Sequence, residues 1–170
     1  MKHLVKENEG IYYCLDEIPK ISKNEIIDLI SKTKKTPGDR SRVCMHKNVN
    51  ERFHEMFIVL LKDCHIRPHK HLKKSESMSI IDGEAYAIIF DNKGKVTQKI
   101  EFGNYISGKE FYYRIARNTY HMLLIESETF VFYEATEGTF LKNDTIFPEW
   151  APITYKKSFF DSIWTNNKIL

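Results

Sequence analysis

Residues 65–84, HIRPHKHLKKSESMSIIDGE, contain three histidines and two glutamates between two apolar stretches of the chain. Side chains alternate between the two faces of a β-strand, so His69 and His71 would point to the same side of an extended segment. Two imidazoles in that arrangement can reach one ion, and a short loop can bring the carboxylate of Glu76 to it. This stretch therefore predicts a metal site built on β structure.

A further ligand is expected from another part of the chain, because two histidines and one carboxylate hold a metal weakly by themselves. His121 is the natural candidate, since it begins the apolar segment YHMLLIE and two predicted hairpins can fold that segment beside the first strand. Imidazole and carboxylate ligands suit zinc, iron, manganese, nickel and cobalt. We therefore expect one divalent metal ion bound by His69, His71, Glu76 and His121, with a position left for water or substrate.

The rest of the chain favours β structure. Segments rich in β-branched and aromatic residues alternate with turn sequences such as Asp82-Gly83. The predicted strands are residues 41–47, 55–62, 64–71, 77–81, 84–90, 95–102, 110–115, 120–126 and 129–135. Many short strands with no helices between them indicate an antiparallel sandwich or barrel.

A single helix is predicted, over residues 22–35 (SKNEIIDLISKTKK). Ser22 and Glu25 have the spacing of a capping box, and Thr36-Pro37-Gly38 ends the helix. The residues expected on its apolar face are Ile26, Ile27 and Ile30.

Length and composition indicate one globular domain. A chain of 170 residues can bury roughly 70% of its unfolded surface, and a 42% hydrophobic content argues against wholesale disorder. We expect an N-terminal segment with the helix (1–40), a barrel core (41–140) and a C-terminal extension (141–170). The aromatic, proline-punctuated extension is expected to cover an edge of the barrel or to contact a second subunit, which leaves a homodimer open.

Charge and cysteine usage exclude several classes of protein. The formal net charge of +3 is spread along the chain, which argues against a nucleic-acid partner. The three cysteines have no disulfide or metal-type spacing, which favours a reducing compartment, and Cys64 is expected to be a small buried hydrophobic residue. Apolar runs are too short for membrane insertion, so we expect a cytoplasmic protein.

Other polar side chains are candidates for binding or catalysis. If the strand is regular through Pro68, His65 and Arg67 share the face of His69. The Arg67 guanidinium suits a phosphate or carboxylate, with a surface salt bridge as the alternative. Arg42, within an even spacing that includes Arg40 and His46, and His54 are further substrate-binding candidates. The candidate proton-transfer groups are Glu55, Tyr133 and Glu134.

The spacing of His69, His71, Glu76 and Gly83 resembles the first motif of the cupins. These are double-stranded β-helix barrels of the jelly-roll type that hold a divalent metal with three histidines and a glutamate. The second cupin motif, PxGxxH, is matched by His121, whereas Ala116 and Asn118 replace its proline and glycine. Asp63 and Ile125 also depart from the cupin pattern. Asparagine tolerates the left-handed conformation that such a turn requires.

A closer resemblance, from Cys14 to Pro152, is to the WbuC family of small cupin metalloproteins. It is carried by SRVCMH, HEMFIVLL, IRPHKHLKKSES, IFDNKGKV, YRIARNTYH and EWAP. That family is typically encoded among genes for O-antigen and other surface polysaccharides. The resemblance implies a sugar or nucleotide-sugar setting, but no particular reaction.

Several functions fit these residues. The metal could act as a Lewis acid in isomerase or lyase chemistry on a sugar ligand, or, as iron, in oxygenase chemistry. Alternatively, the protein is a non-catalytic module that binds a small molecule or saccharide through the metal and Arg67. A purely structural metal would instead predict loss of folding on chelation.

Overall fold

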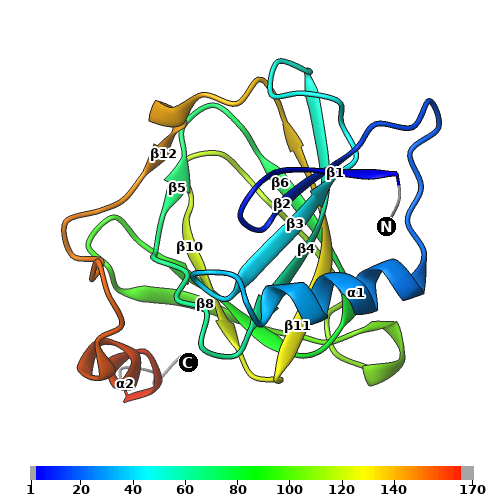
Figure 1. Ribbon diagram of the computed structural model, residues 1–170. Coiled ribbons are helices and arrows are strands. Elements are labelled where there is room, and N and C mark those ends of the chain that lie inside the picture. The colour runs from blue at the N-terminus through cyan, green and yellow to red at the C-terminus, as the bar shows by residue number, and fades with distance from the viewer. Residues whose placement is uncertain (1–2, 166–170) are drawn as a thin grey trace.

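The computed structural model describes residues 3–165 and consists mainly of β-strands (Figure 1). The larger sheet contains, in spatial order, β1 (Leu4–Asn8), β2 (Ile11–Cys14), β3 (Arg40–Cys44), β4 (Phe53–Leu61), β11 (Thr129–Glu137), β6 (Glu76–Asp82) and β9 (Tyr112–Ile115). The smaller sheet contains β10 (Tyr120–Ile125), β7 (Ala85–Phe90) and β8 (Val96–Phe102). A third sheet pairs β12 (Thr145–Ile146) with β5 (Lys70–His71). Within residues 3–165 the pairings are antiparallel except that of β2 with β3.

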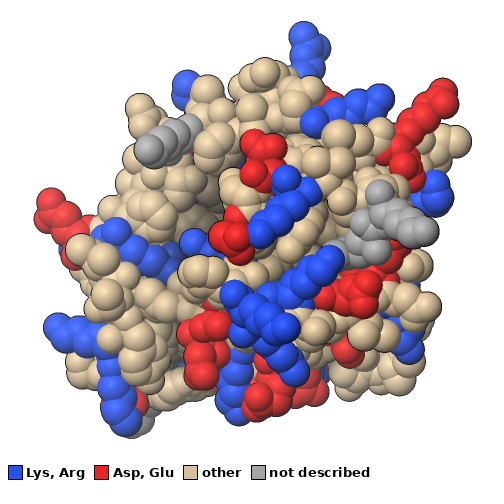
Figure 2. Space-filling model, viewed as in Figure 1, with Lys and Arg blue, Asp and Glu red and all other residues tan. Residues whose placement is uncertain are grey.

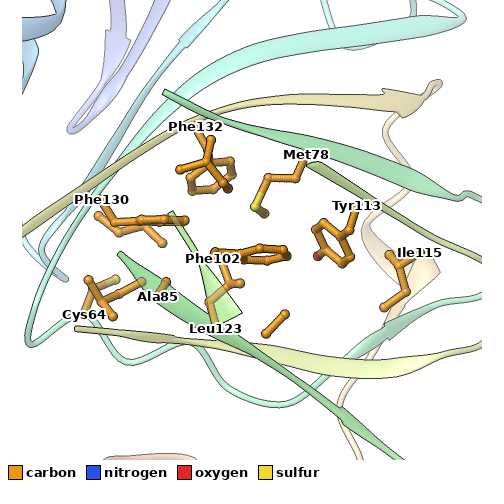
Figure 3. Packing of buried hydrophobic residues seen from close by; sticks show 13 residues of the cluster. Cys64, Met78, Ala85, Phe102, Tyr113, Ile115, Leu123, Phe130 and Phe132 are labelled. Atoms are coloured by element: carbon orange, nitrogen blue, oxygen red, sulfur yellow. The ribbon is translucent and has the colours of Figure 1, made fainter. Parts of the chain in front are cut away.

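The main core lies between the two larger sheets. Phe130 and Met78 point into it from the larger sheet, and Phe102 and Leu123 meet them from the smaller sheet (Figure 3). Cys64 is 8% exposed and belongs to the same cluster, as predicted. The predicted all-β class is confirmed, because mostly antiparallel strands form sheets packed on a common core.

Helix α1 (Lys23–Thr33) packs on the outer face of the larger sheet. Its predicted capping box is confirmed, because the Ser22 side chain accepts from the Glu25 backbone and the Glu25 carboxylate accepts from the Ser22 backbone N–H. Leu29 is fully buried against the outer valines of β4 and β11, whereas Ile27 is 52% exposed. The apolar face is therefore shifted from the predicted one, because Leu29 replaces Ile27 in the contact with the sheet.

Two strand predictions are wrong. The sequence analysis assigned no strand before residue 41, but β1 and β2 extend the larger sheet. The predicted strand 64–71 is reduced to β5 and an isolated bridge at His69. Pro68 is buried and has no N–H to donate to a ladder, which explains why regular pairing begins after it.

The C-terminal extension covers the outer face of the smaller sheet. A second helix, α2 (Lys157–Thr165), was not predicted, and its Ile163 packs against Ile88 and Met122. Short 3₁₀ helices, η1 (Tyr105–Ser107) and η2 (Lys142–Asp144), complete the elements. Within residues 3–165 no helix has the length and apolar character needed to cross a membrane.

The turn after β6 requires glycine. Gly83 has a φ of +86°, and a Cβ at this position would lie 2.2 Å from the carbonyl oxygen of Thr129. The glycine of the first cupin-like motif therefore has a steric role in joining β6 to β7.

Candidate metal centre

Three histidine rings meet where β5 approaches β10. The backbones of His69 and His121 exchange two N–H···O hydrogen bonds of 3.0 and 2.9 Å, which places the predicted distant histidine beside the first. The ring centroid of His69 lies 4.6 Å from that of His121 and 5.2 Å from that of His71. One ligand nitrogen from each ring lies within 4.8 Å of the other two.

Glu76, the first residue of β6, adds a carboxylate to this cluster. Its Oε1 lies 2.7 Å from Nε2 of His121, and its Oε2 lies 3.3 Å from Nε2 of His71. The carboxylate is buried, with 7% of the residue exposed. The structure thus brings together the four side chains selected from the sequence, and their binding of a metal stays a prediction.

The turn before β10 fixes the position of His121. Asn118 has a φ of +64°, so it adopts the left-handed conformation anticipated for this position. Its backbone N–H donates to the carbonyl of His71 at 2.7 Å. Asn118 therefore adopts a backbone conformation that otherwise favours glycine.

Each imidazole is oriented through its Nδ1 atom. The Nδ1 contacts are the carbonyl of Arg67 at 2.8 Å for His69, the carbonyl of Thr119 at 3.0 Å for His121, and the hydroxyl of Thr145 at 3.1 Å for His71. Hydrogen bonds of this kind fix the tautomer and orientation of metal-binding histidines. They leave Nε2 of each ring as the candidate ligand atom, and for His71 and His121 this is the atom that contacts Glu76.

The electrostatics of these four residues favour cation binding. Burial, and next the charge of His121, lowers the pKa of His69 to about 4, so its ring is neutral near pH 7. Burial opposes the charge of Glu76, but hydrogen bonds from His121 and His71 outweigh it and hold the pKa of Glu76 well below its usual range. Burial also opposes the charge of His121, yet its contact with Glu76 raises its pKa. A divalent cation would replace the proton that this pair shares.

The donor set fits a divalent metal ion. Three imidazole nitrogens and one carboxylate oxygen form a mixed nitrogen and oxygen site, which suits zinc and the other transition metals named above. The second described cluster with metal-type ligands, His3, Cys14 and Asp16, lies in the N-terminal segment. Its Asp16 is paired with Lys20 at 2.9 Å.

A second carboxyl group, Glu134, lies on the inner face of the larger sheet. It is directly opposite Met78, two residues along β6 from Glu76. Burial raises the pKa of Glu134 to about 8, with a contribution from the charge of Glu76, while Lys74 and Arg42 oppose this shift. Among the three predicted proton-transfer groups, Glu134 is the one that the structure places near the histidine cluster and Glu76.

Tyr113 was missed by the sequence analysis. It lies opposite Met78 on β9 and points into the barrel beside Phe102 (Figure 3). Its Oη is buried and has no hydrogen-bond partner among the described residues. Burial, and next the charges of Glu76 and Glu134, raises the pKa of this hydroxyl. The sequence predicted a strand over residues 110–115 but contained no signal for the carboxylates near this hydroxyl.

Arg42 and His54 also lie on the inner side of the larger sheet. Arg42 is opposite Ile58, which packs on the main core, and its Nε is buried without a hydrogen-bond partner among the described residues. His54 stacks on His46 with ring centroids 4.0 Å apart. Their substrate-binding roles stay predictions.

His65 and Arg67 contact the C-terminal extension. The Arg67 guanidinium donates to the carbonyls of Ala151 and Pro148 at 3.1 to 3.3 Å and lies 4.9 Å from the ring centroid of Phe147. The His65 ring contacts Phe160, with centroids 5.8 Å apart. The expected regular strand through Pro68 is absent, so the sequence argument that aligned these two residues with His69 fails. Their roles in substrate binding remain untested.

Glu55 and Tyr133 lie on the outer face of the larger sheet. They are hydrogen bonded to each other through the Tyr133 hydroxyl. They alternate with Met56 and Phe132, which face the barrel interior, so they point away from the histidine cluster. The structure does not bring them to the metal centre, and their catalytic role stays a prediction.

One family model matches part of the chain. The profile of a family described as a domain of unknown function, DUF6016, matches residues 21–102. No curated protein matches the chain.

Among solved structures, the chain is similar to oxalate decarboxylase and to seed globulins. The Bacillus subtilis oxalate decarboxylase at pH 4.6 is 21% identical, with 64% of this chain and 27% of that chain covered and a TM-score of 0.49. Procruciferin, an 11S globulin from Brassica napus, is 15% identical, with 52% and 21% covered and a TM-score of 0.43. Pumpkin seed globulin is 19% identical, with 50% and 21% covered and a TM-score of 0.42. The match to this chain spans about a quarter or less of the length of these proteins.

Proposed function

We propose that this protein binds one divalent metal ion through His69, His71, Glu76 and His121. We further propose that it acts on a sugar or nucleotide-sugar intermediate of surface-polysaccharide biosynthesis, such as that of O-antigen. The convergence of three imidazoles, two of them buried, and one buried carboxylate supports the metal. The resemblance to the WbuC family supports the sugar setting.

Different residues of the barrel would have different roles in this function. Hydrogen bonds at Nδ1 hold the imidazoles in position, and burial keeps His69 neutral and able to donate its lone pair. A bound metal ion would supply Lewis acidity toward a carbonyl or vicinal hydroxyls. Glu134 would hold or transfer a proton at its carboxyl oxygen, because it lies on the same inner face.

A non-catalytic binding module is the second candidate. It is favoured by the location of Glu55 and Tyr133 on the outer face of the sheet, which leaves few proton-transfer groups near the metal. Such a module would hold a saccharide at the metal without converting it.

The test uses metal-loaded protein, metal-free protein and a Glu76→Gln variant, each incubated with a panel of nucleotide sugars. Elemental analysis of protein purified without a histidine tag identifies the metal. A product that mass spectrometry detects with the metal-loaded protein alone supports the enzyme. Binding without turnover across the panel supports the module, and failure to take up any divalent ion contradicts both.

A further inference from the structure

The inner face of the larger sheet carries a row of residues that extends away from the metal centre. Successive partners across β9, β6, β11, β4 and β3 in this row are Tyr113, Met78, Glu134, Met56 and Cys44. Arg42 precedes Cys44 by two residues on β3 and therefore shares its face. We call Tyr113, Glu134 and Arg42 the inner polar strip.

Two members of the inner polar strip have buried donors without partners. Neither Oη of Tyr113 nor Nε of Arg42 has a hydrogen bond to any described residue. Buried polar atoms in native proteins are nearly always paired, so an orphan donor needs an explanation. Two such donors on one face, on either side of Glu134, indicate a ligand that accepts hydrogen bonds.

The spacing of the strands sets the size of this ligand. Three strand intervals separate β6, which carries Glu76, from β3, which carries Arg42. At roughly 4.8 Å per interval this is about 14 Å across the sheet, and the four-residue offset between the level of Glu76 and that of Arg42 adds about 13 Å along the strands. Glu134 lies between these ends, one strand interval from β6 and two from β3, and the charges of both Glu76 and Arg42 act on its carboxyl group, so a molecule of monosaccharide size can reach from Glu134 to the guanidinium.

The chemistry of the strip matches a sugar that carries an anionic group. A guanidinium binds phosphate or carboxylate through paired N–H donors. The Glu134 carboxyl and the Tyr113 hydroxyl can bond to sugar hydroxyls, which both donate and accept. Ile58, opposite Arg42 and half-buried, offers an apolar surface beside the guanidinium.

We propose that the inner polar strip binds an anionic monosaccharide, with its phosphate or carboxylate on Arg42 and its hydroxyls on Glu134 and Tyr113. The end of the sugar that contacts Glu134 then lies toward β6, the strand that carries Glu76. This inference rests on the proposed function and names its class of ligand.

The test measures binding by calorimetry with three probes, glucose 6-phosphate, glucuronate and glucose, on manganese-loaded protein. The wild type should bind at least one of the two anionic probes about tenfold or more tightly than glucose, and the better of the two identifies the anionic group. Arg42→Gln should weaken that binding by about 10- to 100-fold, the loss expected for a hydrogen bond to a charged group. Arg40→Gln is the matched control, because Arg40 lies two residues away on β3 and is exposed, and it should leave binding unchanged.

Tyr113→Phe separates binding from folding. Removing an unpaired buried hydroxyl should leave the unfolding temperature equal or higher, while the affinity for the better anionic probe falls severalfold. If Arg42→Gln does not fold, Arg42→Lys replaces it, and a several-fold loss is expected because lysine lacks the planar fork.

Two results would contradict the proposal that the inner polar strip binds an anionic sugar. One is equal affinity for glucose and both anionic probes, and the other is unchanged affinity in the Arg42 variant. Metal uptake measured on the same samples distinguishes the two proposals. Manganese uptake without a preference for the anionic probes contradicts sugar binding by the strip but not metal binding. An absence of divalent-ion uptake contradicts the proposed function. In that case the probe affinities of the wild type and Arg42→Gln, measured without metal, show whether the strip binds the anionic sugar.

Discussion

At the scale of the residue, the metal centre depends on side chains that hold its ligands. Thr145 comes from the C-terminal extension, yet its hydroxyl contacts Nδ1 of His71. β12 brings it there by pairing with β5, with Thr145 directly opposite His71. A residue distant in sequence thus orients a ligand of the central motif.

Replacement of this threonine should weaken metal binding. Thr145→Val keeps the side-chain shape but removes the hydroxyl, and partners of this kind contribute about 10- to 100-fold to metal affinity. Competition with a metal-binding dye measures the change. Thr97→Val, at an exposed position on β8, is the control, and equal affinities of the two variants would show that Thr145 does not support His71.

The stacked pair of His46 and His54 should make the protein less stable in acid. Burial lowers the pKa of both rings, and the charge of His46 lowers that of His54 further. In the unfolded chain both titrate near pH 6.5, at roughly the ordinary value. Below that pH the unfolded chain binds protons that the folded protein does not, so the free energy of unfolding decreases until the lowered folded pKa values are reached.

Urea unfolding at pH 7.5 and pH 5.5 tests this expectation. The wild type should lose stability between the two, and His54→Gln should lose less, whatever its stability at pH 7.5. The same pH-dependent loss in both proteins would exclude His54 as a contributor.

The sequence selected the four side chains that converge in the candidate metal centre, but not the residues around them. The HxH and glutamate spacing is a local pattern, so His69, His71 and Glu76 could be selected directly. Tyr113 and Thr145 depend on strand order and on the path of the C-terminal extension, which no local pattern contains. Arg67 was misplaced because its predicted alignment required a regular strand through Pro68.

At the scale of the element, helix α1 is stabilised by the capping box at its N-terminus. Ser22→Ala removes one half of the capping box and should lower the free energy of unfolding by about 1 kcal/mol. Ser31→Ala, at an exposed position of the same helix, should have a much smaller effect. Urea unfolding of both variants makes the comparison, and equal losses would mean that the cap does not stabilise the helix.

The C-terminal extension should depend on Arg67. Arg67→Gln removes hydrogen bonds to the carbonyls of Pro148 and Ala151, so hydrogen exchange should increase in residues 147–165 and less in the barrel. Arg117→Gln, at an exposed position, serves as the control. An unchanged exchange pattern would show that the apolar contacts of α2 are sufficient.

Elements with a strong local pattern were predicted, and those that depend on tertiary contacts were not. The strands of the barrel alternate apolar and polar residues, which fixed most of them. β1 has the sequence LVKEN and is largely exposed, so it carries little strand pattern. Helix α2 buries Ile163 against the smaller sheet, and the aromatic residues around it were predicted as an edge cover without a helix.

At the scale of the whole molecule, the charged surface and the barrel interior have different roles. Cationic and anionic side chains are interspersed on the face seen in Figure 2. Inside the barrel, the main core is built from residues other than the metal-site residues. The fold should therefore survive removal of the metal.

Metal binding should nevertheless stabilise the folded protein. A metal concentration of 100 times the dissociation constant adds about 2.7 kcal/mol, which corresponds to an increase of about 5 to 10 °C in the unfolding temperature of a domain of this size. Glu76→Gln should abolish most of this increase. Unfolding of the wild type by a chelator alone would indicate a structural metal instead.

The most direct test of the central claim is anomalous diffraction at the absorption edge of the metal found by elemental analysis. The account predicts one anomalous peak at about 2.0 to 2.3 Å from the imidazole nitrogens of His69, His71 and His121 and from a carboxylate oxygen of Glu76. A peak elsewhere in the molecule, or intact crystals without any bound divalent ion after soaking, would contradict it.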